Sequence, residues 1–171
     1  SMDRDTRWER IETAYKMLIH LEGDKYTDSE SAIRASYKKE ITDEFIQPAI
    51  IGKANPIQNG DAVLSMNFRS DRMRQIATAI NKTDFPHFKT QSLDILFTCM
   101  TKYQENFPYP VLFFPKKIEN IFPEILSQNN YRQLRIAETE KYAHVTYFFN
   151  GGNEQSFPGE SRKLIPSPRV A

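Results

Sequence analysis

Residues 61–80 have the sequence DAVLSMNFRSDRMRQIATAI, and this stretch decides the fold. In its first half, every second residue lies on one face: Ala62, Leu64, Met66 and Phe68. This two-residue period is that of a β-strand. In its second half, Met73, Ile76, Ala77 and Ile80 recur at helical spacing. A strand that leads directly into a helix is the opening of an α/β unit.

The C-terminal side of this stretch continues the alternation. Leu93 to Met100 is a continuous apolar run of the kind buried in a parallel sheet. The elements predicted after it are a short apolar run at 111–114, a linker at 115–117, a helix at 118–128, a strand at 133–137 and a helix from Thr139 to Gly151-Gly152. Residues 157–171 show no period.

The N-terminal side is predicted to be mainly helical. The first helix covers Asp3 to Gly23, with an apolar stripe formed by Trp8, Ile11, Tyr15, Leu18 and Ile19. A second helix covers 28–39 with Asp28 or Ser29 as its cap, residues 43–51 are extended, and 52–60 form a loop. The sequence therefore predicts an α/β fold with a mixed, largely parallel sheet and flanking helices.

Composition narrows the class of protein. The formal net charge of the 171 residues is +1, which argues against a nucleic-acid module held by bulk positive charge. The apolar runs are too short to cross a membrane, and the single cysteine fits a reducing compartment, so a cytoplasmic protein is expected. With only six glycines, a glycine-rich phosphate loop is not expected, and bound phosphate would need arginines and helix ends.

Arg69 and Arg72 are the strongest candidates for a binding site. They follow the predicted strand, at the carboxyl end where ligands collect in open α/β sheets. Three residues apart across a helix start, they can reach one point and bind a phosphate or a carboxylate there. The alternative is that Asp71 and nearby acids simply pair with these arginines on a solvated helix start.

Other reactive side chains are weaker candidates. Arg4 lies between Asp3 and Asp5, and Lys141 has Glu138 and Glu140 nearby, so both also fit surface charge clusters. The three histidines (His20, His87 and His144) have no partner at metal-ligand spacing, and Cys99 is expected to be buried and inert. No Ser/His/Asp set and no carboxylate cluster for two metals is present, so neither a catalytic residue nor a metal ligand is predicted.

Several motifs run in order along nearly the whole chain: MDRD (2–5), RWER (7–10), NFRSDR (67–72), LRIAETEKYAHVT (134–146), FNGG (149–152), FPGE (157–160) and PSP (166–168). Together they resemble the cofactor-independent (2,3-bisphosphoglycerate-independent) phosphoglycerate mutases. The longest motif is the most specific. One departure is Ser70, which stands where the family usually has a proline at the first helical turn. The absence of this proline should destabilise the start of the helix slightly.

The resemblance implies a glycolytic isomerase that interconverts 3-phosphoglycerate and 2-phosphoglycerate through a phosphoserine enzyme intermediate. It implies an alkaline-phosphatase-like domain with two manganese ions, and an inserted transferase domain that grips the substrate. The residues that match substrate-binding positions are Arg4, Arg69, Arg72 and Lys141. Ser70 and Asp71, which lie between the two arginines, are included in the predicted substrate-binding site. No residue of this chain matches the phosphorylated serine or a metal ligand.

The chain is therefore interpreted as an internal fragment. Residues 1–115 would be the C-terminal half of the transferase domain, and 116–171 a linker and the return into the phosphatase-like domain. Its partner would be the rest of its own parent chain, and alone it would be inactive. The alternatives are a non-catalytic α/β module that binds phosphorylated small molecules or a partner chain, and another metal-dependent phosphomutase or phosphatase of the same superfamily.

Overall fold

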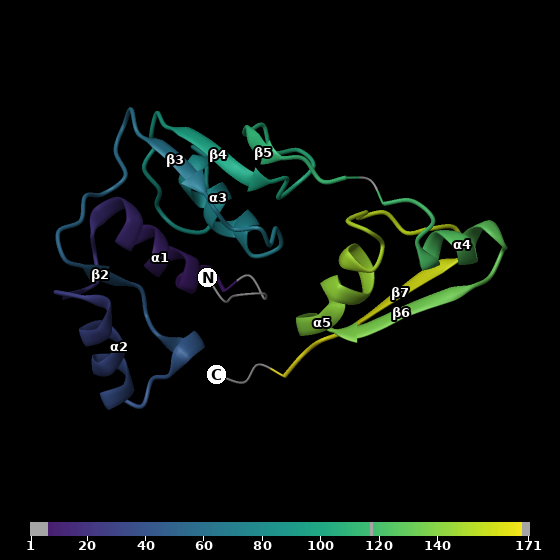
Figure 1. The fold of residues 1–171 in the computed structure, drawn as a ribbon, viewed down its shortest axis with the longest axis horizontal. Coiled ribbons are helices and arrows are strands. Elements are labelled where there is room, and N and C mark those ends of the chain that lie inside the picture. The colour runs from purple at the N-terminus through teal and green to yellow at the C-terminus, as the bar shows by residue number, and fades with distance from the viewer. Residues whose placement is uncertain (1–6, 117, 169–171) are drawn as a thin grey trace. The chain divides into compact units, whose positions relative to one another are not determined.

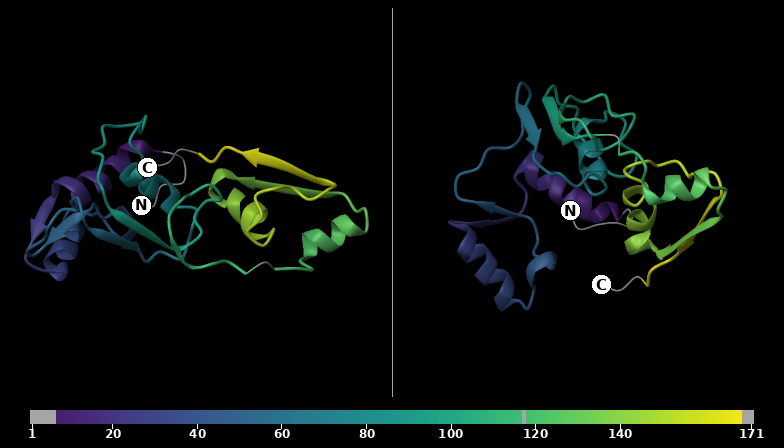
Figure 2. Two further views of the ribbon diagram at one scale, coloured as in Figure 1. Left: turned by 90° about the horizontal axis from the view of Figure 1, so that it is seen from above. Right: turned by 45° about the vertical axis from the view of Figure 1, so that its right-hand side comes forward.

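The computed structural model of the protein describes residues 7–116 and 118–168, and the chain divides into two compact units, Ser1–Phe114 and Pro115–Ala171. Figures 1 and 2 show the elements of each unit. Within the described part, no helix is both long and apolar enough to cross a bilayer.

The first unit is built on a three-stranded parallel sheet. Strands β3 (Ala62–Ser65), β4 (Leu96–Thr101) and β5 (Val111–Phe113) lie in that order, and helix α3 (Met73–Asn81) connects β3 to β4 (Figure 1). The strand and helix predicted within 61–80 are thus confirmed. The strand ends at Ser65 rather than Phe68.

The core of the first unit lies between the inner face of this sheet and two helices. Helix α1 (Trp8–His20) packs against α3, and the apolar stripe predicted for it is confirmed. The buried core residues come from α1 (Ile11, Tyr15, Ile19), α3 (Ile76, Ala77, Ala79, Ile80), β4 (Phe97, Cys99) and Tyr103. Helix α1 ends at His20, and its C-cap is Leu21 with φ 52° and not Gly23 as predicted from the sequence.

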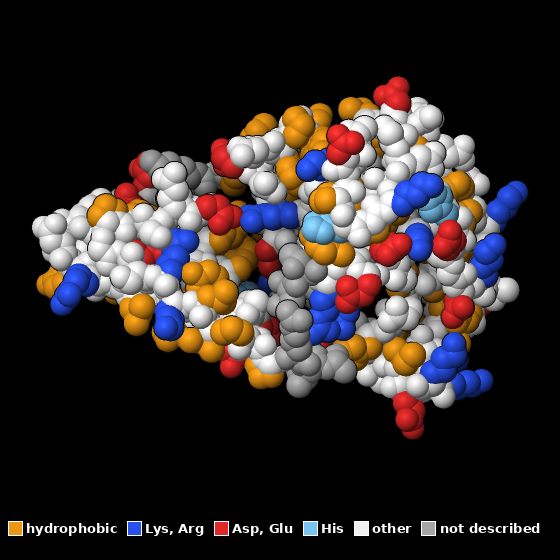
Figure 3. All heavy atoms as spheres, turned by 180° about the vertical axis from the view of Figure 1, so that it is seen from behind, with side chains coloured by type: hydrophobic (Ala, Val, Ile, Leu, Met, Phe, Trp, Pro, Cys, Tyr) orange, Lys and Arg blue, Asp and Glu red, His pale blue; other side chains and the backbone are white. Residues whose placement is uncertain are grey.

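The outer face of the same sheet is apolar and exposed. The parallel register puts Leu64, Leu96 and Leu112 on this face, and Leu64 is 48% exposed. The expectation that the apolar run at 93–100 is buried on both faces is therefore wrong, because only its inner side chains are covered. Apolar side chains reach the surface at several places on the protein (Figure 3).

The remaining elements of the first unit form a small parallel pair with a covering helix. Strand β1 (Asp24–Tyr26) pairs with β2 (Ala49–Ile51), α2 (Ser29–Lys38) lies between them in the chain, and a 3₁₀ turn, η1 (Asp43–Phe45), precedes β2. Asp28 caps α2 as predicted, because its carboxylate accepts from the Ser31 N–H at 2.7 Å. The sequence did not predict β1.

The second unit is a two-stranded parallel sheet with short helices. It contains α4 (Phe122–Gln128), β6 (Gln133–Glu138), α5 (Thr139–Ala143), a π-helical turn η2 (His144–Phe148) and β7 (Glu160–Ile165). The expectation of one α-helix from Thr139 to the glycine pair is wrong in its second half, which is π-helical. The glycines do end it, with φ 65° and 88°.

Strand β7 is the largest difference from the sequence prediction, which left residues 157–171 without an element. Its sequence, ESRKLI, carries too many charged residues to show a period. Pairing with β6 over six residues, from Gln133 with Glu160 to Glu138 with Ile165, makes it a strand. The described residues thus form three separate parallel sheets and not the single sheet expected, whereas the predicted α/β class, the parallel pairing and the flanking helices are confirmed.

A polar network fills the buried side of the second unit. Glu160 accepts hydrogen bonds from Asn150 Nδ2 at 2.9 Å, Arg162 Nε at 2.6 Å and the Phe157 N–H at 3.2 Å. Arg135 is 8% exposed, and its guanidinium lies over the Phe149 ring at 4.8 Å. The interior of this unit is therefore largely polar.

Candidate anion-binding site

The end of strand β3 is held in place by Tyr103, which is buried just after β4. Its hydroxyl lies 2.8 Å from Ser65 Oγ and donates to the Asn67 carbonyl at 2.6 Å. Its own carbonyl accepts from Arg74 Nε at 2.6 Å. These bonds join the ends of β3 and β4 to the start of α3, so the turn between Asn67 and Arg72 starts from a fixed position.

Within this turn, Arg69 and Asp71 form a two-pronged ion pair. Arg69 Nε donates to Asp71 Oδ1 at 2.7 Å, and Nη2 donates to Oδ2 at 2.9 Å. Burial acts to raise the pKa of Asp71, but the hydrogen bonds and charge of Arg69 outweigh it, so the pKa lies below its ordinary value. The pairing expected under the alternative interpretation is therefore present for Arg69, whose side chain is 40% exposed.

Arg72 and Ser70 occupy the positions on either side of Asp71. Helix α3 begins at Met73, so Arg72 is its N-cap residue, and the predicted arginine pair lies just before the helix rather than across its first turn. Ser70 is buried, and its carbonyl accepts from the Met73 N–H at 3.0 Å. Ser70 thus helps to form the turn from which Arg72 projects.

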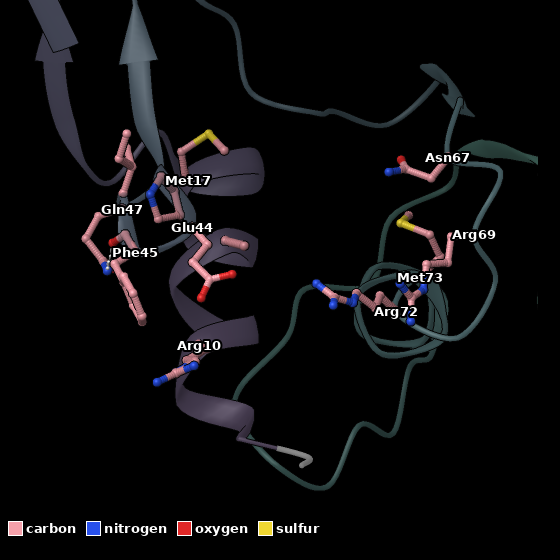
Figure 4. Close-up of a pocket in the computed structure, with 12 residues that line it drawn as sticks. Arg10, Met17, Glu44, Phe45, Gln47, Asn67, Arg69, Arg72 and Met73 are labelled. Atoms are coloured by element: carbon pink, nitrogen blue, oxygen red, sulfur yellow. Dashed lines mark hydrogen bonds between the residues drawn. The ribbon is translucent and has the colours of Figure 1, made fainter. Parts of the chain in front are cut away.

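A pocket of about 840 Å³ opens beside this turn. One wall is the end of β3 and the start of α3, with Asn67, Arg69, Arg72 and Met73. Its floor is α1, and another wall is the segment 44–48 (Figure 4). In Figure 4 the Arg72 side chain extends from α3 into the space beside α1.

The charges around this pocket favour an anion. Three arginines (Arg10, Arg69 and Arg72) line it against one carboxylate, Glu44. Guanidinium groups bind phosphate and carboxylate oxygens through paired hydrogen bonds, and they stay charged over the whole physiological pH range. The pocket is thus suited to a small anionic molecule.

The other predicted site residues lie elsewhere. Lys141 belongs to the second unit, where it is 64% exposed as a side chain and its Nζ lies 3.9 Å from Glu140 Oε1. It lies three residues after the carboxyl end of β6, and the segments that follow β6 and β7 are joined there because the Ser167 N–H donates to Thr139 Oγ1 at 3.2 Å. Arg4 lies outside the described residues.

Metal-binding and nucleophilic side chains do not gather in the described part of the chain. No group of three or more His, Cys, Asp and Glu side chains there could hold a metal ion. These residues therefore do not fit the manganese pair that the resemblance implies. Cys99 is buried as expected, and burial raises the pKa of its thiol.

Similarity to known proteins shows the family to which this chain belongs. Residues 1–105 match the family described as BPG-independent PGAM N-terminus (iPGM_N). The chain belongs to the BPG-independent phosphoglycerate mutase family. The 2,3-bisphosphoglycerate-independent phosphoglycerate mutase of Moorella thermoacetica is 49% identical over 177 residues and that of Myxococcus xanthus 49% over 175, covering 100% and 99% of this chain.

A solved phosphoglycerate mutase has the same fold. The crystal structure of the Leishmania mexicana enzyme at low cobalt concentration has a TM-score of 0.84 and 28% identity over 99% of this chain. The chain covers 34% of each bacterial relative and 33% of the Leishmania chain. It therefore spans about a third of the length of these mutases, as the fragment hypothesis requires.

Some residues at this site were not predicted from the sequence. Arg10, Ala14 and Met17 form a second stripe on α1, spaced four and three residues apart, and this spacing could have indicated a shared face. The wall at 44–48 had no such indication, because irregular segments carry no period. Tyr103 was missed for the same reason.

Proposed function

We propose that this chain is the substrate-binding part of an isomerase that interconverts 3-phosphoglycerate and 2-phosphoglycerate through a phosphoserine intermediate. The pocket of the first unit would hold the phosphorylated acid while its phosphoryl group leaves one hydroxyl and returns to the other. The observation that carries this proposal is the arginine-lined pocket at the end of β3 in a member of the phosphoglycerate mutase family.

The site residues would act in different ways. Arg69 and Arg72 would bind an anionic group of the substrate directly, since both line the pocket. Asp71 would hold the guanidinium of Arg69, and Ser70 would shape the turn, so these two are best placed to position the arginines. Arg4 and Lys141 are proposed as further substrate ligands on the family resemblance alone.

The chemical step would need parts outside these 171 residues. By the resemblance, the phosphorylated serine and the ligands of two manganese ions lie in other segments of a longer polypeptide, and the Leishmania relative was crystallised with cobalt. The exposed apolar side chains on the outer face of the β3–β4–β5 sheet support such a partner, because a surface of this kind is normally covered. A cytoplasmic location stays a prediction.

Calorimetric titration with 3-phosphoglycerate tests the binding role. We expect weak binding that falls with rising salt, because exposed arginines are screened and only part of the site is present. Arg69→Ala and Arg72→Ala should each abolish the heat of binding. Arg34→Ala removes the same charge from α2, away from the pocket, and should leave binding unchanged.

A turnover assay tests the division of labour. The isolated chain should convert no 3-phosphoglycerate even with Mn²⁺ supplied, since the described residues lack a metal cluster. Measurable turnover by the pure chain would refute this part of the proposal. Unchanged binding in both arginine variants would instead place the anion elsewhere.

A further inference from the structure

The pocket contains a third arginine, Arg10, to which the proposed function assigns no role. Arg10 lies on α1, whereas Arg69 and Arg72 lie across the pocket after β3 (Figure 4). Two separate cationic positions therefore border one cavity.

The backbone of Arg10 is held firmly although its side chain is exposed. Its neighbour Ile11 and the next residues of the same stripe, Tyr15 and Ile19, are buried in the core. The face that Arg10 shares with Ala14 and Met17 is turned to the pocket instead. Core packing thus fixes where the Arg10 side chain starts. In Figure 4 this side chain points away from Arg69 and Arg72, and rotation about its four side-chain torsions would bring the guanidinium toward them.

The hydrogen bonding of Arg10 differs from that of Arg69. Arg69 already gives two hydrogen bonds to Asp71, which offsets much of its charge. Within the described ranges 7–116 and 118–168, the Arg10 guanidinium makes no hydrogen bond or ion pair. Its donors are therefore available to a ligand without breaking an existing contact.

The proposed substrate has a charged group at each end of a three-carbon chain, a phosphate and a carboxylate. We infer that Arg10 binds one of these groups while Arg69 and Arg72 bind the other, so that Arg10 sets the preference for ligands charged at both ends. This inference rests on the proposed function. It makes Arg10 a specificity-determining residue.

Ligands with one or two charged ends test this inference. The chain and its Arg10→Gln variant would be titrated at low salt with 3-phosphoglycerate, glycerol 3-phosphate and glycerate. We expect the variant to raise the dissociation constant for 3-phosphoglycerate about tenfold, the loss of one charge-assisted contact. Of the two ligands with one charged end, the one that carries the group held by Arg69 and Arg72 should change by less than about twofold.

Two further variants complete the experiment. Arg34→Gln, with the same loss of charge on α2, should change none of the three constants, and Arg10→Lys should recover part of the affinity for 3-phosphoglycerate. An equal loss for all three ligands, or no loss for 3-phosphoglycerate, would overturn the inference and leave the proposed function standing. Failure of the unmodified chain to bind 3-phosphoglycerate would refute the proposed function itself.

Discussion

The two units of this protein are stabilised in different ways. The first unit buries isoleucines, alanines and aromatic rings from α1, α3 and β4 in one apolar core. The second unit buries mainly polar side chains, including Gln133, Arg135, Thr146 and Asn150, while the apolar residues Leu134 and Ile136 of β6 are exposed. Apolar burial drives folding, so the first unit has the larger driving force of its own.

This difference indicates which of the two units depends for its stability on contacts outside itself. A two-stranded sheet is marginal in water unless one face is covered. The second unit leaves the Leu134 face of β6 open and relies on hydrogen bonds to Glu160 underneath. We therefore expect the first unit to be more stable than the second in the isolated chain. The substitutions and the pH change described below test this difference in stability.

The largest effect should come from a core substitution in the first unit. Ile11 is fully buried, so Ile11→Ala should lower the free energy of unfolding by about 2–5 kcal/mol. Leu134 is 59% exposed, so Leu134→Ala should change it by less than about 0.5 kcal/mol. Urea unfolding followed by Trp8, the single tryptophan, reports on the first unit, and amide exchange in β6 reports on the second.

Equal losses of unfolding free energy in Ile11→Ala and Leu134→Ala would contradict the expected difference in stability between the two units. They would mean that Leu134 is covered in solution, for example by a second copy of the chain. Sedimentation of both proteins is the control for that outcome.

The next effect should come from the polar network of the second unit. Glu160→Ala removes the acceptor of three hydrogen bonds and leaves the Asn150 and Arg162 donors buried, which should cost about 1–3 kcal/mol. The loss should appear as faster amide exchange in β6 and β7, with Trp8-detected unfolding unchanged. Ser161→Ala, an exposed change on the same strand, should alter neither, and a neutral Glu160→Ala would show that the network is dispensable.

A smaller effect should appear on acidification. Burial raises the pKa of Glu160, but the hydrogen bonds from Arg162, Asn150 and Phe157 outweigh it and lower the pKa below its ordinary value. The charged form therefore stabilises the fold above the ordinary pKa, and this contribution is lost as the pH falls through the lowered value. Amide protection in β6 should decrease below about pH 4, and Glu160→Gln should show a weaker pH dependence.

The smallest effect should come from Asp71→Asn in the first unit. The Arg69–Asp71 pair is partly exposed, so its loss should cost no more than about 1 kcal/mol in Trp8-detected unfolding. A cost similar to that of Ile11→Ala would mean that the turn after β3, and not the apolar core, limits the stability of this unit.

The elements that could be predicted from the sequence are those with an internal period. The stripe from Ile11 to Ile19 and the alternation before Arg69 each repeat often enough to identify a helix or a strand. Strand β7 could not be predicted, because it exists through its pairing with β6 and half of its own residues are charged. The open face of β4 was also missed, because an apolar run does not show which of its sides is covered.

The residues of the candidate site likewise divide into those that the sequence predicts and those that it does not. Arg69 and Arg72 were predicted because the end of a strand is a recurrent ligand position, and both line the pocket. The alternative interpretation, in which Asp71 pairs with the arginines, is confirmed for Arg69. Arg10 and the wall at 44–48 come from segments distant in the sequence, and only packing brings them to this pocket.

We propose that the pocket beside α1 and the turn after β3 binds the phosphorylated acid. The most direct measurement is an NMR titration of the isotope-labelled chain with 3-phosphoglycerate. We expect saturable chemical-shift changes concentrated at the amides of Asn67, Arg69 and Arg72 and around Arg10. Shifts confined to other parts of the first unit, or none at millimolar ligand, would contradict it.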